Sequence, residues 1–387
     1  MIPIAKPFIN RSEADAASRA VLSGWVSQGP QVAAFEVEFA NFVGAAHACA
    51  VSNCTTALHL ALLGVGVSPG DEVITVSHSF IATANTIRQC GATPVFVDIE
   101  RDGYNIDPTA IAAAMTPATR AILVVHQMGM PCDMPAILKL AGAHGLPVIE
   151  DAACAAGSEL RMRNAWLRIG RPLGDVVCFS FHPRKVITTG EGGMLTTNRV
   201  ELDAGFRLAR QHGMSVSDAV RHNSPQVVIE SYPVTGFNYR MTDIQASIGR
   251  EQLKRLPGIV SRRRTLAERY STRLALLPGV SAPVEPRWAR SNWQSYCVRL
   301  SDGIDQLGVM QAMLDRGVAT RRGIMNAHQE AAYADIATTS LLRSEAARDH
   351  SILLPLYAQM TDEEQDKVLS ALEETLALVR RRGAQSA

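Results

Sequence analysis

The apolar residues in the first half of the chain form short runs, and stretches with helical periodicity separate these runs. Buried strands are predicted at 72–76, 93–97, 121–125, 147–150 and 176–181, followed by another at 193–197. Helical patterns lie between them at 56–63, 81–89 and 134–144. This alternation predicts βαβ units and a mostly parallel central sheet with helices on its faces.

The second half of the chain shows longer helical patterns. One helix is expected at 243–255, ending at Leu256-Pro257-Gly258, and a second at 261–277. A strand at 294–300, a helix at 306–316 and a last helix opened by a capping box at 361–364 follow.

A chain of 387 residues exceeds one comfortable core, so two lobes are expected. We predict an α/β protein with a large lobe over residues 1–255, including an N-terminal arm at 1–30. A smaller α+β lobe would occupy residues 256–387.

Composition narrows the range of functions. The chain is 47% apolar and 19% charged, with a formal net charge of +1, as in an ordinary soluble globular protein. Nothing in this balance favours nucleic acid or an anionic membrane as a partner. Arginines cluster at 262–264 and 380–382, beside helical patterns, and we interpret both clusters as solvated helix faces.

The seven cysteines are odd in number and scattered, and no CxxC occurs. Reduced thiols in a cytoplasmic protein are therefore expected rather than a disulfide framework. No cysteine and histidine have the spacing of metal ligands, so no metal is expected. No run of about 18 apolar residues suggests a membrane span.

One lysine stands apart from the rest of the composition. The chain has five lysines against 33 arginines, and Lys185 alone follows a buried apolar run in a glycine-rich stretch. Because an ammonium group is strongly hydrated, a lysine beside a buried run suggests a chemical role, such as a Schiff base with a carbonyl.

Other residues of the first lobe fit the same ligand. Hydroxyls and free N–H groups at 52–56 precede an apolar helix and suit an anion. Asp151 and Ser180 end two strands of the expected sheet, where α/β proteins bind ligands, and Phe80 offers an aromatic face. A phosphate, a flat ring, a ring nitrogen that needs an acid and an aldehyde that needs an amine together describe pyridoxal phosphate (PLP).

The chain resembles the DegT/DnrJ/EryC1/StrS family of PLP-dependent sugar aminotransferases, which have fold type I. The likeness extends from about residue 24 to residue 357. Its strongest motifs lie at 57–62 (ALHLAL), 91–98 (GATPVFVD), 150–153 (EDAA), 179–193 (FSFHPRKVITTGEGG) and 236–246 (GFNYRMTDIQA).

The resemblance implies a role for each matching residue. Lys185 would form the Schiff base and move the proton, Asp151 would pair with the pyridine nitrogen, and Phe80 would stack on the ring. The phosphate would be held by Cys54, Thr55, Ser180 and, from the neighbouring subunit, Asn238. A homodimer with shared active sites follows from that last role.

One residue departs from the family pattern. Relatives often have Gln, His or Glu three residues after the aspartate, near the phenolic oxygen of the cofactor, and this chain has Cys154. A thiol is a weak hydrogen-bond partner, so either a water or another group takes this role or the electronics of the cofactor differ slightly. The simpler interpretation of Cys154 is a small apolar filler. Retention of Lys185, where the dehydratase branch of the family has histidine, favours transamination with an amino acid donor, by analogy L-glutamate.

The substrate is less well defined by the sequence. By resemblance, Gly24 and Trp25 would contact a sugar nucleotide, and His328 would face the substrate. Arg321 and Arg322 suit a diphosphate, and a basic loop at 161–168 offers further contacts. The alternatives are an aminotransferase for a keto-cyclitol and a non-catalytic protein of the same fold; a nicotinamide dehydrogenase is disfavoured because no GxGxxG follows the first strand.

Overall fold

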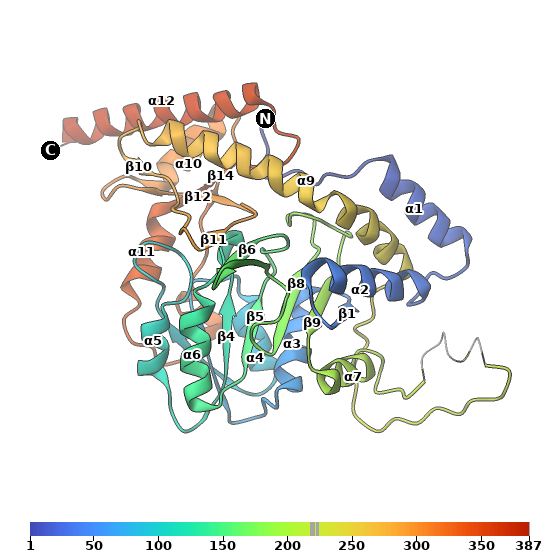
Figure 1. Cartoon of the computed structure of the whole chain (residues 1–387). Coiled ribbons are helices and arrows are strands. Elements are labelled where there is room, and N and C mark those ends of the chain that lie inside the picture. The colour runs from blue at the N-terminus through green and yellow to red at the C-terminus, as the bar shows by residue number, and fades with distance from the viewer. Residues whose placement is uncertain (217–220, 222–223, 387) are drawn as a thin grey trace.

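The computed structural model of the chain describes residues 1–216, 221 and 224–386 (Figure 1). Its largest element is a seven-stranded sheet. The strands, in spatial order, are β1 (His47–Val51), β9 (Gly193–Thr197), β8 (Val176–Ser180), β5 (Val148–Asp151), β4 (Thr119–Val125), β2 (Glu72–Val76) and β3 (Thr93–Val97). The five strands from β8 to β3 are parallel, and β9 is antiparallel to both of its neighbours. The predicted mostly parallel sheet is therefore confirmed.

Both faces of this sheet are covered, which explains why apolar residues occur on both faces of its strands. Successive side chains of a strand point to opposite faces. In β4, Ile122 and Val124 accordingly join one apolar core, and Ala121 and Leu123 join another.

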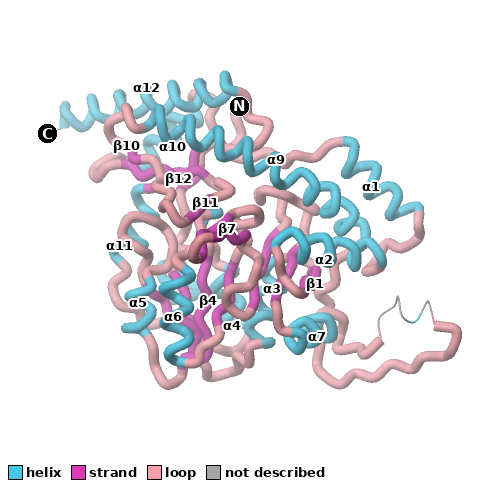
Figure 2. The backbone as a smooth tube through the Cα atoms, in the orientation of Figure 1, coloured by secondary structure: helices cyan, strands magenta, loops and turns pink. Residues whose placement is uncertain are grey.

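Each core is completed by helices that the sequence places between the strands. The first core includes residues of α2 (Pro30–Val43), α5 (Pro108–Ala114) and α6 (Met134–His144). The second includes α3 (Cys54–Gly64) and α7 (Val200–Ala209) and lies on the side of α4 (Ala82–Gln89). Figure 2 shows these helices on either side of the strands.

A second, antiparallel sheet follows in the last third of the chain. Its strands, in spatial order, are β10 (Val280–Ser281), β12 (Tyr296–Leu300), β14 (Ser351–Leu354) and β13 (Arg321–Arg322). It shares an apolar core with α10 (Gln306–Asp315), α12 (Asp362–Ser386) and the end of α9 (Asp243–Leu274). Ile2 also belongs to this core and pairs with Val318, so the start of the predicted N-terminal arm packs on the small sheet.

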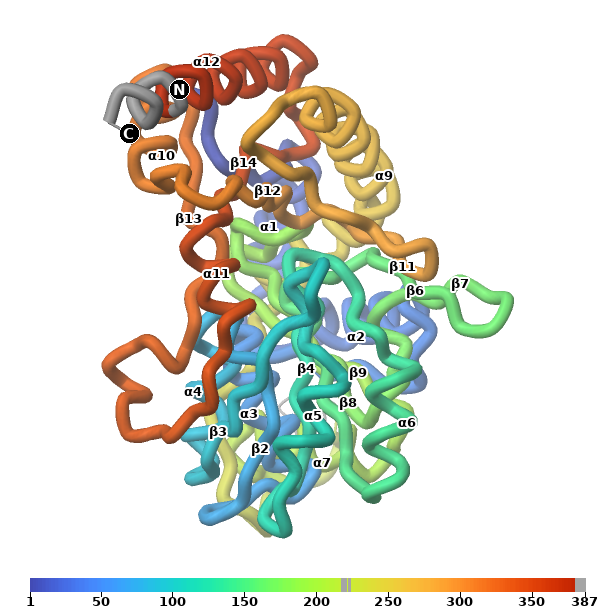
Figure 3. The backbone as a smooth tube through the Cα atoms, turned by 90° about the vertical axis from the view of Figure 1, so that its left-hand side faces the viewer, coloured from blue at the N-terminus to red at the C-terminus, as the bar shows by residue number. Residues whose placement is uncertain are grey.

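Smaller elements lie between the seven-stranded sheet and the four-stranded sheet. A three-stranded sheet joins β11 (Ala289–Arg290) to the hairpin of β6 (Glu159–Met162) and β7 (Ala165–Arg168). The segment that carries η2 (Ala327–Gln329), η3 (Ala331–Tyr333) and α11 (Leu342–His350) packs beside α4 and β3, as Figure 3 shows. The remaining elements are α1 (Arg11–Leu22) and η1 (Gln127–Gly129).

The helix prediction around residue 257 is wrong. A single helix, α9, runs through Pro257 and passes from the large sheet to the small one (Figure 1). Buried Leu253, Leu256, Ile259 and Val260 pack on both sides of the proline, so tertiary packing outweighs the hydrogen bond that proline cannot make. The predicted lobe boundary at 255–256 lies inside this helix, and the division stays a prediction.

The expectation of a solvated face at 262–264 is also wrong in one respect. Arg263 is only 6% exposed, and its guanidinium donates to the carbonyl oxygens of Trp293 and Gln294 at 2.9 and 2.6 Å. The side chains of the other arginine cluster, 380–382, lie outside the described residues. Among the helices that are described, none combines the length and apolar character needed to cross a membrane.

Candidate active site

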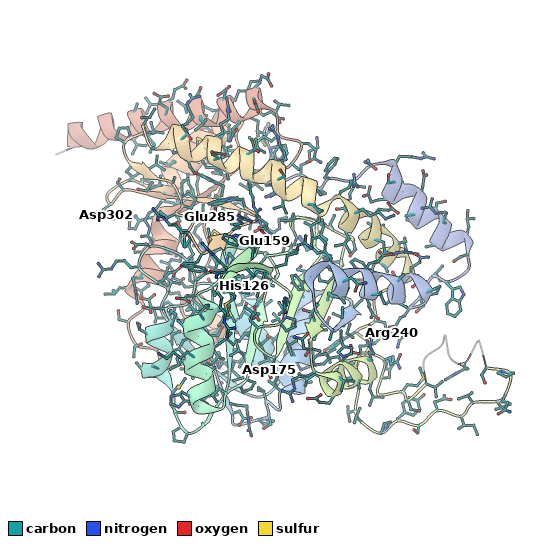
Figure 4. The ribbon with its side chains drawn as sticks, in the orientation of Figure 1. His126, Glu159, Asp175, Arg240, Glu285 and Asp302 are labelled. Carbon is teal, nitrogen blue, oxygen red and sulfur yellow. The ribbon has the colours of Figure 1, made fainter. Side chains whose placement is uncertain are left out.

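The carboxyl ends of the parallel strands bring most of the predicted site residues to one edge of the large sheet. Strand β5 ends at Asp151 and β8 at Ser180, and the two strands are neighbours. His126 follows β4 at the same edge, and Arg240 pairs with Val51 at the end of β1; both are labelled in Figure 4. This is the edge at which open α/β sheets bind ligands.

Asp151 is buried, and a described donor bonds each of its carboxylate oxygens. The backbone N–H of Ala153 donates to Oδ1 at 3.0 Å, and the Thr83 hydroxyl donates to Oδ2 at 2.9 Å. Burial raises the pKa of Asp151, whereas these two hydrogen bonds and the charge of Lys185 act in the opposite direction. Each oxygen keeps lone-pair capacity for a further donor, such as a protonated ring nitrogen.

Behind Asp151 lies a buried histidine with a defined tautomer. His126 Nδ1 accepts from the N–H of Cys132 at 3.0 Å, so the ring hydrogen is on Nε2, which donates to Glu150 at 3.0 Å. Both side chains are buried. The pair therefore fixes the strand position immediately before Asp151.

Lys185 points into the same cluster. Its ammonium group donates to Cys154 Sγ at 3.2 Å. Burial disfavours the ammonium form, but Cys154 and Asp151 act in the opposite direction, and the pKa of Lys185 is raised. Cys154 is thus not only a filler, because it is the hydrogen-bond partner of the lysine.

The N-terminus of α3 supplies the predicted anion site. A capping box between Asn53 and Thr56 satisfies two of the free N–H groups at this end. The N–H groups of Cys54 and Thr55 have no hydrogen-bond partner in the described part of the chain, so they are available to a phosphate. Burial raises the pKa of the Cys54 thiol well above its usual value, which keeps Cys54 uncharged beside an anion.

Ser180 and Phe80 lie next to these groups along the edge. Ser180 pairs with Gly193, and Gly193 packs against the Asn53–Cys54 peptide so closely that a Cβ there would clash. The end of β8 at Ser180 therefore lies at the same corner as the start of α3. Phe80 lies three residues before Thr83 and is 64% exposed, so its aromatic side chain is accessible to a flat ligand.

His328 lies in η2, in the segment between β13 and α11 that packs beside the large sheet. Its Nε2 faces the carboxylate of Glu345 at 3.3 Å and must donate to it, so Nδ1 accepts the hydroxyl hydrogen of Ser77 at 2.6 Å. The backbone N–H of His328 also donates to Ser77 Oγ at 3.1 Å. The ring is therefore held rigidly by two partners, and its role toward substrate stays a prediction.

The other predicted substrate residues are not in contact with this cluster. Arg321 and Arg322 are exposed on β13, at the edge of the small sheet. Gly24 and Trp25 lie in the loop between α1 and α2, where Gly29 packs between the Trp25 ring and the carboxylate of Asp243. For these four residues the structure gives a position, and their contact with a substrate stays a prediction.

Asn238 lies beside the α3 corner of its own chain. It pairs with Gln211, and the neighbouring carbonyl of Tyr239 accepts from the N–H of Ser52 at 2.8 Å. The Asn238 residue itself is exposed. Its predicted action on the site of a second subunit stays a prediction.

Several residues that hold the site were not predicted from the sequence. Asn292 Nδ2 donates to the carbonyl of Cys154 at 2.8 Å, and Gln294 Nε2 donates to the carbonyl of Arg184 at 2.8 Å. One short loop after β11 therefore fastens both the turn of Cys154 and the turn of Lys185. Neither amide carries a sequence signal, because the contacts join residues more than 100 positions apart.

The cluster has the composition of a site for PLP. A lysine amine, a buried carboxylate, free N–H groups at a helix start and an exposed aromatic ring are the groups that an aldehyde, a pyridine nitrogen, a phosphate and a flat ring require. The residues present therefore fit the cofactor. On a mostly parallel α/β sheet they define the class of fold type I aminotransferases.

Comparison with known proteins agrees with this class. The model of the DegT/DnrJ/EryC1/StrS aminotransferase family matches residues 7–373. The spore coat polysaccharide biosynthesis protein SpsC of Bacillus subtilis is 39% identical over 96% of both chains. GDP-perosamine synthase of Caulobacter vibrioides is 39% identical over 97% of this chain and 98% of its own.

A solved structure gives the same result. The putative sugar aminotransferase Spr1654 from Streptococcus pneumoniae, in its PMP form, superposes with a TM-score of 0.90 at 26% identity, over 98% of this chain and 100% of its own. The chain belongs to the DegT/DnrJ/EryC1/StrS aminotransferase family. Since amino-group transfer of this kind uses PLP, it is a PLP-dependent enzyme.

Proposed function

We propose that this enzyme transfers an amino group from an amino acid, with L-glutamate as the expected donor, to the keto group of a nucleotide-linked sugar. The product would be an amino sugar for a polysaccharide or a glycosylated metabolite. The observation that carries the proposal is the cluster in which half-buried Lys185 Nζ lies 3.2 Å from Cys154, within electrostatic reach of buried Asp151. The relative GDP-perosamine synthase supports a nucleotide sugar as substrate.

Bound PLP supplies an electron sink for the reacting carbon. Lys185 would hold the cofactor and then move the proton at Nζ, and Asp151 would keep the ring nitrogen protonated. Ser180 and the N–H groups of Cys54 and Thr55 would bind the phosphate, with Phe80 against the ring. Burial of Asp151 keeps its carboxylate away from solvent, and Lys185 is half-buried beside it.

The arginines of β13 are the proposed contacts for the diphosphate. Adjacent residues of a strand point to opposite faces, so at most one of Arg321 and Arg322 faces the site. Both are exposed and can form bidentate bonds with phosphate. This favours a nucleotide sugar over the alternative substrate, a keto-cyclitol.

The function is tested in two stages. Borohydride reduction of the purified enzyme should fix the cofactor covalently to Lys185, as peptide mass mapping would show. Lys185→Ala should lose the label, whereas Lys139→Ala, at an exposed lysine on α6, should keep it. Label on another lysine would refute the assignment.

In the second stage, nucleotide-linked 3-keto and 4-keto sugars and a keto-cyclitol are offered with glutamate. Amino-sugar product from a nucleotide sugar is expected, with Arg321→Ala or Arg322→Ala raising KM for that substrate alone. Turnover of the cyclitol only would replace the proposed substrate.

The proposal includes a homodimer with shared sites. Residues 224–242, which lead into α9, include a part that projects from the body (Figure 1), and Val227, Ile229 and Tyr232 on it are 94%, 87% and 58% exposed. Exposed apolar side chains on a projecting segment are typical of an interface, and Asn238 lies in the same segment. The unpaired thiols and the nucleotide-linked substrate fit a cytoplasmic location.

Subunit mixing tests the shared site. Lys185→Ala and Asn238→Ala are each expected to be inactive alone. If Asn238 acts on the partner's site, mixed dimers contain one intact site, and an equal mixture should regain about a quarter of wild-type activity. If Asn238 acts within its own chain, no activity returns.

A further inference from the structure

Two hydroxyl groups form a buried chain that ends on Asp151. Ser79 Oγ lies 3.0 Å from Thr83 Oγ1, which lies 2.9 Å from Asp151 Oδ2. The exposed fractions of Ser79, Thr83 and Asp151 are 3%, 2% and 5%. The sequence interpretation assigned no role to either hydroxyl residue.

The carboxylate of Asp151 determines which hydroxyl donates in each of these two hydrogen bonds. An ionised carboxylate only accepts, so the single hydroxyl hydrogen of Thr83 is donated to Asp151. Thr83 Oγ1 can then only accept from Ser79, whose hydroxyl hydrogen must point toward Thr83. Both hydroxyl dipoles are therefore aligned toward the carboxylate and stabilise its negative form.

The local fold makes this alignment rigid. Thr83 is the second residue of α4, and its N–H donates to the carbonyl of Phe80 at 3.1 Å. The second oxygen of Asp151 is held independently by the N–H of Ala153. The carboxylate therefore has one defined orientation, set from two sides.

We propose that Thr83, supported by Ser79, is a positioning residue that keeps Asp151 ionised and oriented toward the ring nitrogen of the cofactor. This inference rests on the proposed role of Asp151. The two hydroxyl groups act only through the carboxylate of Asp151. They therefore affect the binding only of a ligand with a protonated ring nitrogen that can donate to this carboxylate.

The test compares two ligands on cofactor-free enzyme by absorbance or fluorescence titration. One is PLP, and the other is 1-deaza-PLP, in which a C–H group replaces the ring nitrogen. Thr83→Val removes one hydrogen bond to a charged group, so PLP binding should weaken on the order of 10- to 100-fold. Binding of 1-deaza-PLP should change less than about threefold, since no proton is shared with Asp151.

Two variants control for shape. Thr83→Ser keeps the hydroxyl and should restore PLP binding to within about threefold of wild type. Thr86→Val makes the same change one turn later on α4, where a buried hydroxyl donates to the carbonyl of Thr83. It should leave the preference for PLP over 1-deaza-PLP intact. Equal weakening of both ligands by Thr83→Val, or no weakening, would overturn the proposal.

Two further variants keep the outcome decisive. If Thr83→Val does not fold, Ser79→Ala tests the other hydroxyl group. It should weaken the binding of PLP several-fold without affecting the binding of 1-deaza-PLP. Equal effects on the binding of both ligands reject the proposal. Asp151→Asn should abolish the preference for PLP. If it does not, the assignment of Asp151 fails; if Asp151→Asn abolishes the preference and Thr83→Val does not, only the role of Thr83 fails.

Discussion

The buried histidine of the loop after β2 predicts how the enzyme responds to acid. His78 is fully buried, and its Nδ1 lies 2.8 Å from Asn326 Oδ1. The amide nitrogen of Asn326 donates to Gln329 and Ser344, which fixes the amide so that Oδ1 faces the ring. His78 Nδ1 therefore carries the hydrogen, and Nε2 has no hydrogen-bond partner among the described residues.

Protonation of His78 would place a charge and an unpaired N–H in a buried position. Burial lowers the pKa of His78 from 6.5 to about 4; the bond to Asn326 and the charge of Asp98 oppose this change, and Arg299 adds to it. Because the unfolded chain binds the proton more readily, stability is lost as pH falls from about 6.5 to about 4. The difference in pKa corresponds to about 3 kcal/mol.

The perturbation is His78→Asn, which keeps an N–H donor near Asn326 and does not titrate. Urea unfolding at one protein concentration, at pH 7 and near pH 4, gives the free energy of unfolding of both proteins. The wild type should lose about 3 kcal/mol more than the variant between these conditions. His144→Asn, at an exposed histidine ending α6, should follow the wild type. Parallel losses in the wild type and His78→Asn would refute the reasoning.

Three other predictions follow from the site. Covalent attachment of PLP needs the neutral amine of Lys185, and the pKa of this amine is raised. The attachment rate, followed by stopped-flow absorbance, should therefore rise between about pH 7 and about pH 10. A rate that does not change with pH would contradict this prediction. Cys154→Gln should still bind PLP within about threefold of wild type in an absorbance titration, since cofactor binding depends on other groups; loss of binding would disprove this. Asp243 accepts from the N–H groups of Gly29, Gln31 and Val32, so Asp243→Ala should cost about 3 kcal/mol in urea unfolding and Asp243→Asn much less.

The sequence predicts the architecture well where local pattern and burial agree. Strands β2 and β3 have the predicted bounds, because a strand covered on both faces carries apolar residues on both of them. The capping box at Thr361 and Glu364 is likewise confirmed, with bonds of 3.0 and 3.1 Å. Pro257 was misinterpreted, since its local preference gives no information about the buried residues around it.

The same limit applies to the site. The cofactor-facing residues could be found because each follows a strand or opens a helix, which is a local signal. Asn292, Gln294 and Ser77 escaped prediction because each acts through a bond to a residue far away in the sequence. Arg263 was expected to be solvated and is buried. The sequence pattern of a helix does not distinguish a buried arginine from a solvated one.

The loop after β2 connects the cofactor half of the site to the substrate half. Ser77 holds His328, His78 bonds Asn326 beside it, and Ser79 with Thr83 reaches Asp151. Ser77 and His78, on the side of the predicted substrate histidine, are therefore followed directly along the chain by Ser79 and Thr83, which orient the carboxylate of Asp151. Since both sets share one short backbone segment, a displacement that moves His328 also moves the hydroxyl chain. Neutral, buried His78 fixes this segment and so holds His328 and Asp151 in a defined relative position. Protonation of His78 in acid would disturb that arrangement.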